Sequence, residues 1–110
     1  MKNYVNLDDV LPIEYDQYTY LPLLDEKNGC KAGCRTGILR YKQMVYNQGG
    51  IHDDQEIFFV LKGEGSALID TEEITLSPGV CFVVPPGKYH SIKKNFTCDF
   101  IELYFFHAAV

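Results

Sequence analysis

In the stretch "HDDQE", one histidine and two carboxylate residues stand at every second position, a spacing that suggests metal binding. His52, Asp54 and Glu56 would share one face if this stretch is extended, because alternate side chains of a strand point the same way. Imidazole nitrogen and carboxylate oxygen both bind divalent metal ions. We expect His90, which follows the turn "PPGKYH", to begin another strand and supply a further ligand. His107, in "FFHAAV", is expected to be a strand-end or surface residue.

The elements that must position these residues are short strands. After about residue 36, apolar runs of four to eight residues or slightly more alternate with turns rich in Gly, Pro, Asn and Glu. Such spacing is typical of an all-β sandwich or barrel of antiparallel strands. The predicted runs are 36–46, 56–63, 66–70, 73–76, 80–84, 90–94 and 98–106.

Several of these runs are apolar on both faces. In "EIFFVL", Phe58 and Val60 point one way, while Ile57, Phe59 and Leu61 point the other. One face can fill a barrel, and the other then needs a second sheet or a partner subunit to cover it. An apolar outer face of this size favours a homodimer.

The bulk composition fits one globular domain of 110 residues. We predict that residues 1–36 form an arm, or short strands, packed on the outside of a β-barrel made by residues 37–110. The net charge of −5 and a longest basic run of only Lys93-Lys94 argue against a nucleic-acid partner. No apolar stretch approaches the roughly 20 residues of a membrane helix, and "MKNYVNLDDV" has no apolar signal core, which predicts a cytoplasmic protein without a membrane partner.

Two motif fragments, in order and close together, resemble the signature motifs of the cupins. They are His52-x3-Glu56-x6-Gly63 and Gly79-x5-Pro85-x-Gly87-x2-His90. The sharp part of the resemblance spans residues 49–90, and the strand pattern extends it to about 37–106. The resemblance implies a single-domain, jelly-roll-like barrel, the double-stranded β-helix.

The resemblance also implies a metal site inside that barrel. Cupins typically hold a divalent metal ion with two His and one Glu from the first motif and one His from the second. His52 and Glu56 match the second His and the Glu of the first motif, and His90 matches the His of the second. The expected cofactor is therefore a divalent ion such as Fe, Mn, Ni or Zn.

The chain departs from the family pattern at three positions. The first His of the first motif would stand at position 50, which is Gly50. The opening glycine would stand at Met44, and the closing Asn of the second motif at Lys94. One of the four usual ligands is thus missing, because glycine has no side chain to replace it.

Three interpretations follow for the metal site. His52, Glu56 and His90 can bind the ion alone, in the facial arrangement of non-haem iron enzymes with open positions for oxygen or substrate. A neighbour such as Gln48 or Asp54, or a water, can fill the gap. Alternatively the site is degenerate, and the barrel binds a ligand or has no chemical role.

The resemblance leaves the reaction open, because fold does not determine function. As an enzyme, the protein would be a metal-dependent dioxygenase, isomerase, epimerase or lyase of a small molecule. An isomerase or lyase needs an acid/base group, and Tyr104, Glu102 and Tyr89 are the candidates. The alternative is a non-catalytic cupin that binds or senses a small ligand.

Overall fold

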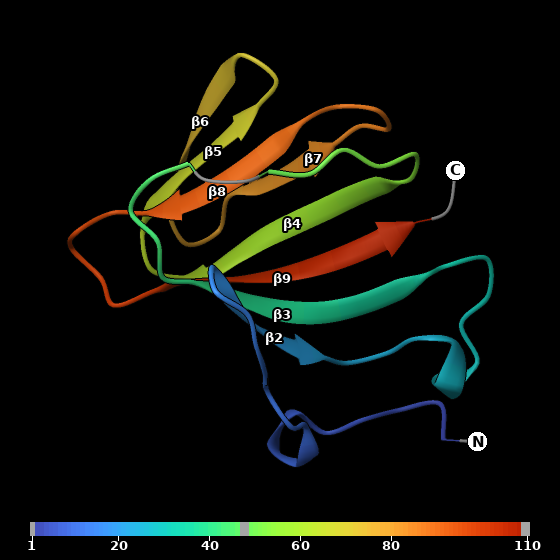
Figure 1. The fold of residues 1–110 in the computed structure, drawn as a ribbon. Helices are drawn as coiled ribbons and strands as arrows, with labels where there is room; N and C mark the ends of the chain where they lie inside the picture. The colour runs from blue at the N-terminus through green and yellow to red at the C-terminus, as the bar shows by residue number, and fades with distance from the viewer. Residues whose placement is uncertain (1, 47–48, 109–110) are drawn as a thin grey trace.

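Nine strands and two 3-10 helices make up the described part of the chain, residues 2–46 and 49–108 of the computed structural model (Figure 1). No helix among these residues is long and apolar enough to cross a membrane. The predicted all-β fold is confirmed. The elements are η1 (Leu7–Asp9), β1 (Ile13–Glu14), β2 (Tyr18–Pro22), η2 (Glu26–Asn28), β3 (Arg35–Tyr41), β4 (Gln55–Lys62), β5 (Gly65–Ile69), β6 (Glu72–Leu76), β7 (Cys81–Val84), β8 (His90–Lys94) and β9 (Ile101–Ala108).

The strands form two antiparallel sheets. The larger sheet has the order β1-β2-β3-β9-β4-β7, and the smaller one has the order β6-β5-β8. Figure 1 shows β2, β3, β9 and β4 side by side, with the β5–β6 hairpin rising away from them. The last strand, β9, is thereby placed between β3 and β4, in the middle of the larger sheet.

The core lies between the two sheets and follows the predicted alternation in β4. Phe58 and Val60 are 0% exposed, while Ile57, Phe59 and Leu61 are 39–41% exposed on the opposite face. Burying an aromatic or aliphatic side chain contributes roughly 1.5–3 kcal/mol. The core cluster consists of Leu39, Phe58, Val60, Ala67, Leu76, Phe82, Val84, Ile92, Ile101, Leu103 and Phe105.

Strand β9 continues two residues beyond the predicted run, and this changes the position of His107. Its inward face carries Ile101, Leu103 and Phe105, all buried, and the same alternation brings the His107 side chain inward. His107 is 4% exposed and pairs with Glu56 of β4. His107 does lie at the end of a strand, as expected, but it is buried and is not a surface residue.

The N-terminal segment contributes strands to the larger sheet. β2 pairs with β3 over five positions, from Tyr18↔Tyr41 to Pro22↔Gly37, and β1 pairs with β2. The boundary predicted at residue 36 falls inside β3. Residues 18–22 are thus part of the wall of the fold.

Two turns at the motif positions bring the chain back sharply. Gly63, after β4, has φ +87°, and a Cβ there would meet the Phe100 carbonyl oxygen at 2.5 Å, so only glycine fits without strain. In the turn 85–87, Gly87 donates its N–H to the His52 carbonyl at 2.8 Å. The second turn therefore holds the segment that carries His52.

Candidate metal centre

One carboxylate oxygen lies among three imidazoles at one end of the core. Glu56 Oε1 is 3.0 Å from His52 Nε2, 3.1 Å from His107 Nε2 and 3.5 Å from His90 Nε2. Glu56, His90 and His107 are buried, while the His52 side chain is one-third exposed. All three histidines of the chain thus converge on one acidic residue.

The convergence has a different local origin from the one expected. Strand β4 begins only at Gln55, so His52 lies in the preceding loop and not on an extended strand. Two backbone connections hold this loop in place. The backbone N–H of Gly87 donates to the His52 carbonyl, as described above, and Gly50 forms a β-bridge with His90. The loop is therefore fixed against the start of β8, which carries the second motif's histidine.

A second carboxylate faces the outer nitrogens of two of the imidazoles. Asp54 Oδ1 is 3.3 Å from His52 Nδ1, and Asp54 Oδ2 is 2.7 Å from His107 Nδ1. Each of these two imidazoles therefore has Asp54 on its Nδ1 side and Glu56 on its Nε2 side. Carboxylates that bind the outer nitrogen of a metal-ligating histidine orient the ring and select its tautomer.

The geometry fits a divalent metal ion. Metal–nitrogen and metal–oxygen bonds of about 2.1 Å at right angles place ligand atoms about 3 Å apart, close to the distances around Glu56 Oε1. Ligand atoms of His52, Glu56 and His90 all lie within 4.8 Å of one another, as do those of His52, Asp54 and His107. Burial lowers the pKa of His90, which favours the neutral imidazole that binds metal.

Position 50 faces this cluster directly. A Cβ on Gly50 would lie 3.5 Å from His90 Cε1 and 3.7 Å from His52 Nε2, in ordinary van der Waals contact. A side chain there would project into the cluster, so the glycine leaves space where the family has a ligand. Gln48, the other residue considered for this gap, lies outside the described residues.

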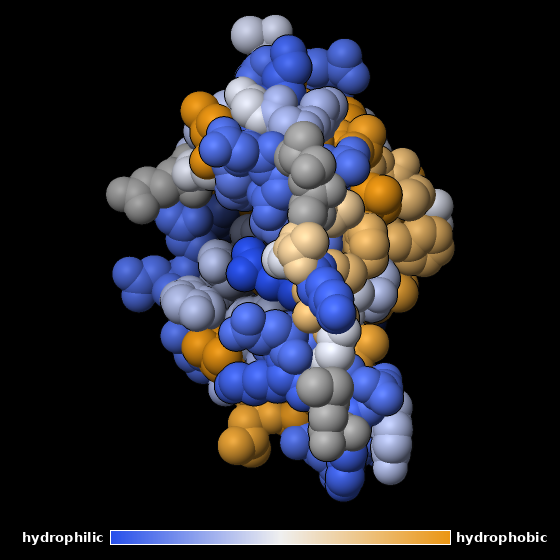
Figure 2. All heavy atoms as spheres, turned by 90° about the vertical axis from the view of Figure 1, so that its right-hand side faces the viewer, coloured by the Kyte–Doolittle hydropathy of each residue, from blue (hydrophilic) through white to orange (hydrophobic). Residues whose placement is uncertain are grey.

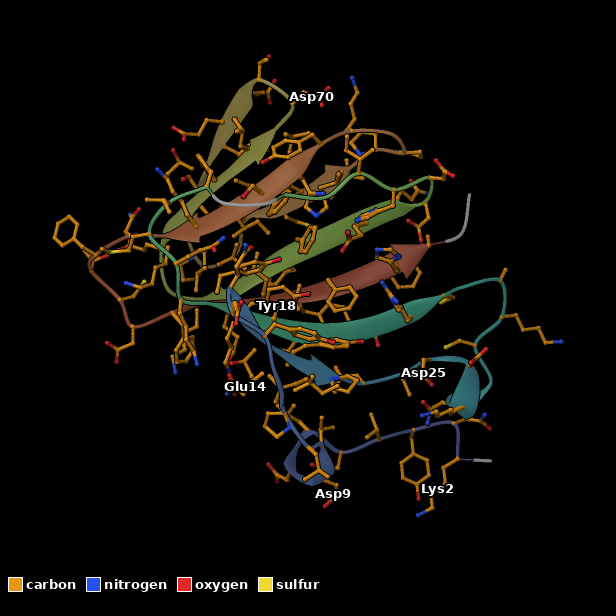
Figure 3. All side chains as sticks on the ribbon, viewed as in Figure 1. Lys2, Asp9, Glu14, Tyr18, Asp25 and Asp70 are labelled. Carbon is orange, nitrogen blue, oxygen red and sulfur yellow. The ribbon has the colours of Figure 1, made fainter. Side chains whose placement is uncertain are left out.

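The cluster opens into a cavity of about 530 Å³. Burial raises the pKa of Tyr41, and the nearby Glu56 charge raises it further, so its hydroxyl stays protonated and can donate a hydrogen bond. Figure 3 shows Tyr18 on β2, the strand that the N-terminal segment adds to this wall. Besides the histidines and Glu56, the cavity is lined by Tyr15, Asp16, Gln17, Tyr18, Tyr20, Arg35, Leu39, Tyr41, Gln43, Gly49, Gly50, Ser91, Ile92 and Phe105.

The three residues expected to supply acid/base chemistry do not line this cavity. Glu102 and Tyr104 lie on the outer face of β9, because the odd-numbered positions up to His107 point inward and the even-numbered ones point outward. There Glu102 forms an ion pair with Arg40, whose Nε lies 2.7 Å from Glu102 Oε2, and Tyr104 is 36% exposed. The Tyr89 ring lies against the backbone of residue 49. These three candidate acid/base residues therefore lie outside the described lining of the cavity.

Sequence reasoning did not assign His107 to the site, although one signal for it was present. The inward parity of Ile101, Leu103 and Phe105 continues to position 107. The pattern did not contain the pairing of β9 with β4, and this pairing places His107 directly opposite Glu56.

Comparison with known proteins identifies the fold. The family described as "Cupin domain" (Cupin_2) matches residues 47–104. No curated protein matches. Among solved structures, a predicted oxalate decarboxylase from Thermotoga maritima matches with a TM-score of 0.81 and 16% identity, over 96% of this chain and 98% of that one.

Two further structures have the same fold. The cupin domain of Schizosaccharomyces pombe Cnp3 matches with a TM-score of 0.78 and 20% identity, over 96% of this chain and 72% of that one. Fe(II)-HppE with an alternative substrate matches with a TM-score of 0.78 and 15% identity, over 96% of this chain and 59% of that one. At these identities the structural likeness shows the fold alone. With the family match over more than half of its length, the chain belongs to the cupin family.

Proposed function

We propose that this cupin binds a divalent metal ion through His52, Glu56 and His90, and that it binds or converts a small molecule in the adjoining cavity. The observation that carries the proposal is the position of Glu56 Oε1, at metal-ligand spacing from both imidazoles. These are also the residues that match the family's motifs. The buried carboxylate needs a cation beside it, because an isolated charge in a low-dielectric site is costly.

The nature of the metal follows from the donor set only in part. Two imidazoles and one carboxylate suit iron, manganese, nickel and zinc, and their facial arrangement is the one used by non-haem iron enzymes. One of the similar structures contains Fe(II), as its name states. The proposal therefore covers a divalent transition metal, with iron as the first ion to test.

The cavity wall supports a small polar ligand. When bound, the metal would polarise an oxygen of that ligand as a Lewis acid or activate oxygen. The protonated Tyr41 hydroxyl can donate a hydrogen bond to the ligand, and the guanidinium of Arg35 can attract an anionic group. Two of the similar proteins are named for small-molecule chemistry, a predicted decarboxylase and an epoxidase.

A non-catalytic ligand-binding or sensor cupin is the second candidate. It is favoured by the positions of Glu102, Tyr104 and Tyr89, none of which reaches the cavity to act as an acid or base. The four tyrosines that line the cavity, Tyr15, Tyr18, Tyr20 and Tyr41, offer stacking surface and hydroxyl groups, which serve binding as well as catalysis.

The metal proposal is tested by elemental analysis of protein purified without chelator or affinity metal. We expect near-stoichiometric metal in the parent and its loss in His90→Ala. Asp9→Asn is the control, since it changes an exposed carboxylate of η1 outside the cluster. A parent that takes up no iron, manganese, nickel or zinc after reconstitution would overturn the proposal and direct the search to metal-free ligands.

We further propose that the outer face of the larger sheet forms a homodimer. Neighbouring strands β7, β4 and β9 expose apolar side chains there, and Figure 2 shows hydrophobic residues gathered along one side of the molecule. A contiguous apolar face on a soluble domain is typical of an interaction site. The exposed residues of this face are Ile57, Phe59, Leu61, Val83 and Tyr104.

Light scattering coupled to gel filtration tests the dimer. Phe59→Glu places a charge at the centre of the face and should yield a monomer. Phe96→Glu is the control, because Phe96 is 86% exposed outside this face and its substitution should leave the dimer intact. A parent that is monomeric at all concentrations would contradict the proposal.

A further inference from the structure

We infer that His107 is the third histidine ligand of this metal centre, in place of the one missing at Gly50, and that Asp54 positions its ring. The inference rests on the proposed metal function. It assigns a ligand from the last strand, outside both motifs, and it changes the role considered for Asp54 from ligand to orienting carboxylate.

The His107 side chain lies as close to Glu56 as the motif histidines do. Strands β4 and β9 pair in a register that sets Glu56 opposite His107. His107 Nε2 lies 3.1 Å from Glu56 Oε1, between the 3.0 Å of His52 and the 3.5 Å of His90. Its position on a central strand of the sheet, at 4% exposure, also makes it more rigidly held than a loop residue.

The hydrogen-bond chemistry of His107 points to a cation beside it. An ionised carboxylate only accepts hydrogen bonds, so the 2.7 Å contact with Asp54 Oδ2 places the proton on Nδ1. On the other side of the ring, His107 Nε2 lies 3.1 Å from Glu56 Oε1, which is the spacing of two ligand atoms on one ion. A metal ion bound by both atoms would supply the positive charge that a buried carboxylate needs beside it.

His52 has a similar arrangement, with a longer contact to Asp54. Its Nδ1 faces Asp54 at 3.3 Å and its Nε2 faces Glu56 at 3.0 Å. One carboxylate thus orients two imidazoles toward the other carboxylate. A single divalent ion would bind both Nε2 atoms and neutralise the charges of Asp54 and Glu56 together.

The position of Gly50 beside the cluster gives the inference a direct test. A Cβ at position 50 contacts His90 and His52 without a clash, so a histidine there would enter the same cluster from another side. If His107 is a ligand, its loss should be repaired by a histidine at position 50. A histidine that only balanced charge through its contact with Asp54 would not be replaceable in this way.

The experiment measures Co²⁺ binding by calorimetry and by the visible absorption of the bound ion, with circular dichroism to confirm folding. In His107→Ala we expect affinity to fall by more than about 100-fold, beyond the usual effect of losing an outer-shell partner. Asp54→Asn should weaken binding by roughly 10- to 100-fold. The double variant Gly50→His/His107→Ala should recover most of the lost affinity. Asp9→Asn, which changes an exposed carboxylate of η1 outside the cluster, is the control with parent affinity.

Three results decide the matter. His107→Ala that is folded and binds Co²⁺ with parent affinity and an unchanged spectrum would overturn the inference while leaving the proposed function intact. A parent that binds no metal would overturn the proposed function itself. If His107→Ala does not fold, His107→Gln and the double variant carry the same comparison, since both retain a polar group in the cluster.

Discussion

Gly50 and His90 hold each other by a reciprocal pair of backbone hydrogen bonds. Each N–H donates to the other's carbonyl oxygen at 3.0 Å. This bridge joins the loop before β4 to the first residue of β8, so one motif is attached to the other through the main chain. A change in this loop should therefore alter the geometry of the candidate metal centre.

The two adjacent glycines of the loop should respond differently to a methyl group. Gly49→Ala would drive a Cβ into the His90 carbonyl and the Tyr89 ring, which costs about 1–3 kcal/mol. Gly50→Ala meets only ordinary contacts and has no positive φ, so it should be neutral or stabilise by up to about 1 kcal/mol. Urea unfolding of the two variants makes the comparison. Equal stabilities would show that the loop is not packed as described.

The buried aromatic of β4 should carry much of the core's stability. Phe58 is 0% exposed and stacks on Phe82 with ring centroids 5.0 Å apart. Phe58→Ala should lower the free energy of unfolding by about 3–5 kcal/mol, measured by chemical denaturation. Phe96→Ala, at an exposed phenylalanine, should change it by no more than about 0.5 kcal/mol. A small change in the free energy of unfolding for Phe58→Ala would contradict the central place of Phe58 in the core.

Metal should stabilise the fold in proportion to its occupancy. An ion that binds only the folded protein adds about 2.7 kcal/mol at 100 times its dissociation constant, which raises the melting temperature by roughly 10 °C. Chelator should remove this gain. Glu56→Gln keeps the side-chain shape but loses the charge, so its melting temperature should not respond to metal. A response in Glu56→Gln equal to that of the parent would exclude Glu56 as a ligand.

Asp70 should make stability depend on pH in the acid range. It lies at the turn between β5 and β6 (Figure 3), and the Lys88 ammonium together with the Tyr89 backbone N–H lowers the pKa of its carboxyl group. The lower folded-state pKa means that the charged form stabilises the fold above the unfolded value of about 3.9, and that this contribution is lost as the pH falls through the folded value.

Asp70→Asn should therefore be less stable than the parent at pH 7, with the difference shrinking as the pH approaches about 3. Asparagine suits the comparison because it also tolerates the left-handed backbone of this position, where φ is 51°. Asp9→Asn, in η1, is the control. Urea midpoints across the pH series that run parallel for Asp70→Asn and parent would contradict the assignment.

The sequence by itself determined the strands and the motif residues. Turn residues bracket each apolar run, so the strands from β4 to β8 appear within one or two residues of their predicted ends. Alternation correctly separated Phe58 and Val60 from the outer side chains of β4. Both signals are local, because they depend on neighbouring residues in one strand. The spacing around His52, Glu56 and His90 is equally local, and the structure brings these three together.

Only the tertiary structure decided the rest of the site. His107 reaches Glu56 because β9 inserts between β3 and β4 in one register, and that register also directs Glu102 and Tyr104 outward. Tyr18 reaches the cavity because β2 joins the sheet beside β3. These contacts join residues far apart in the chain. Cross-strand pairing depends on how whole faces pack against each other, so the spacing of residues along one strand does not contain it.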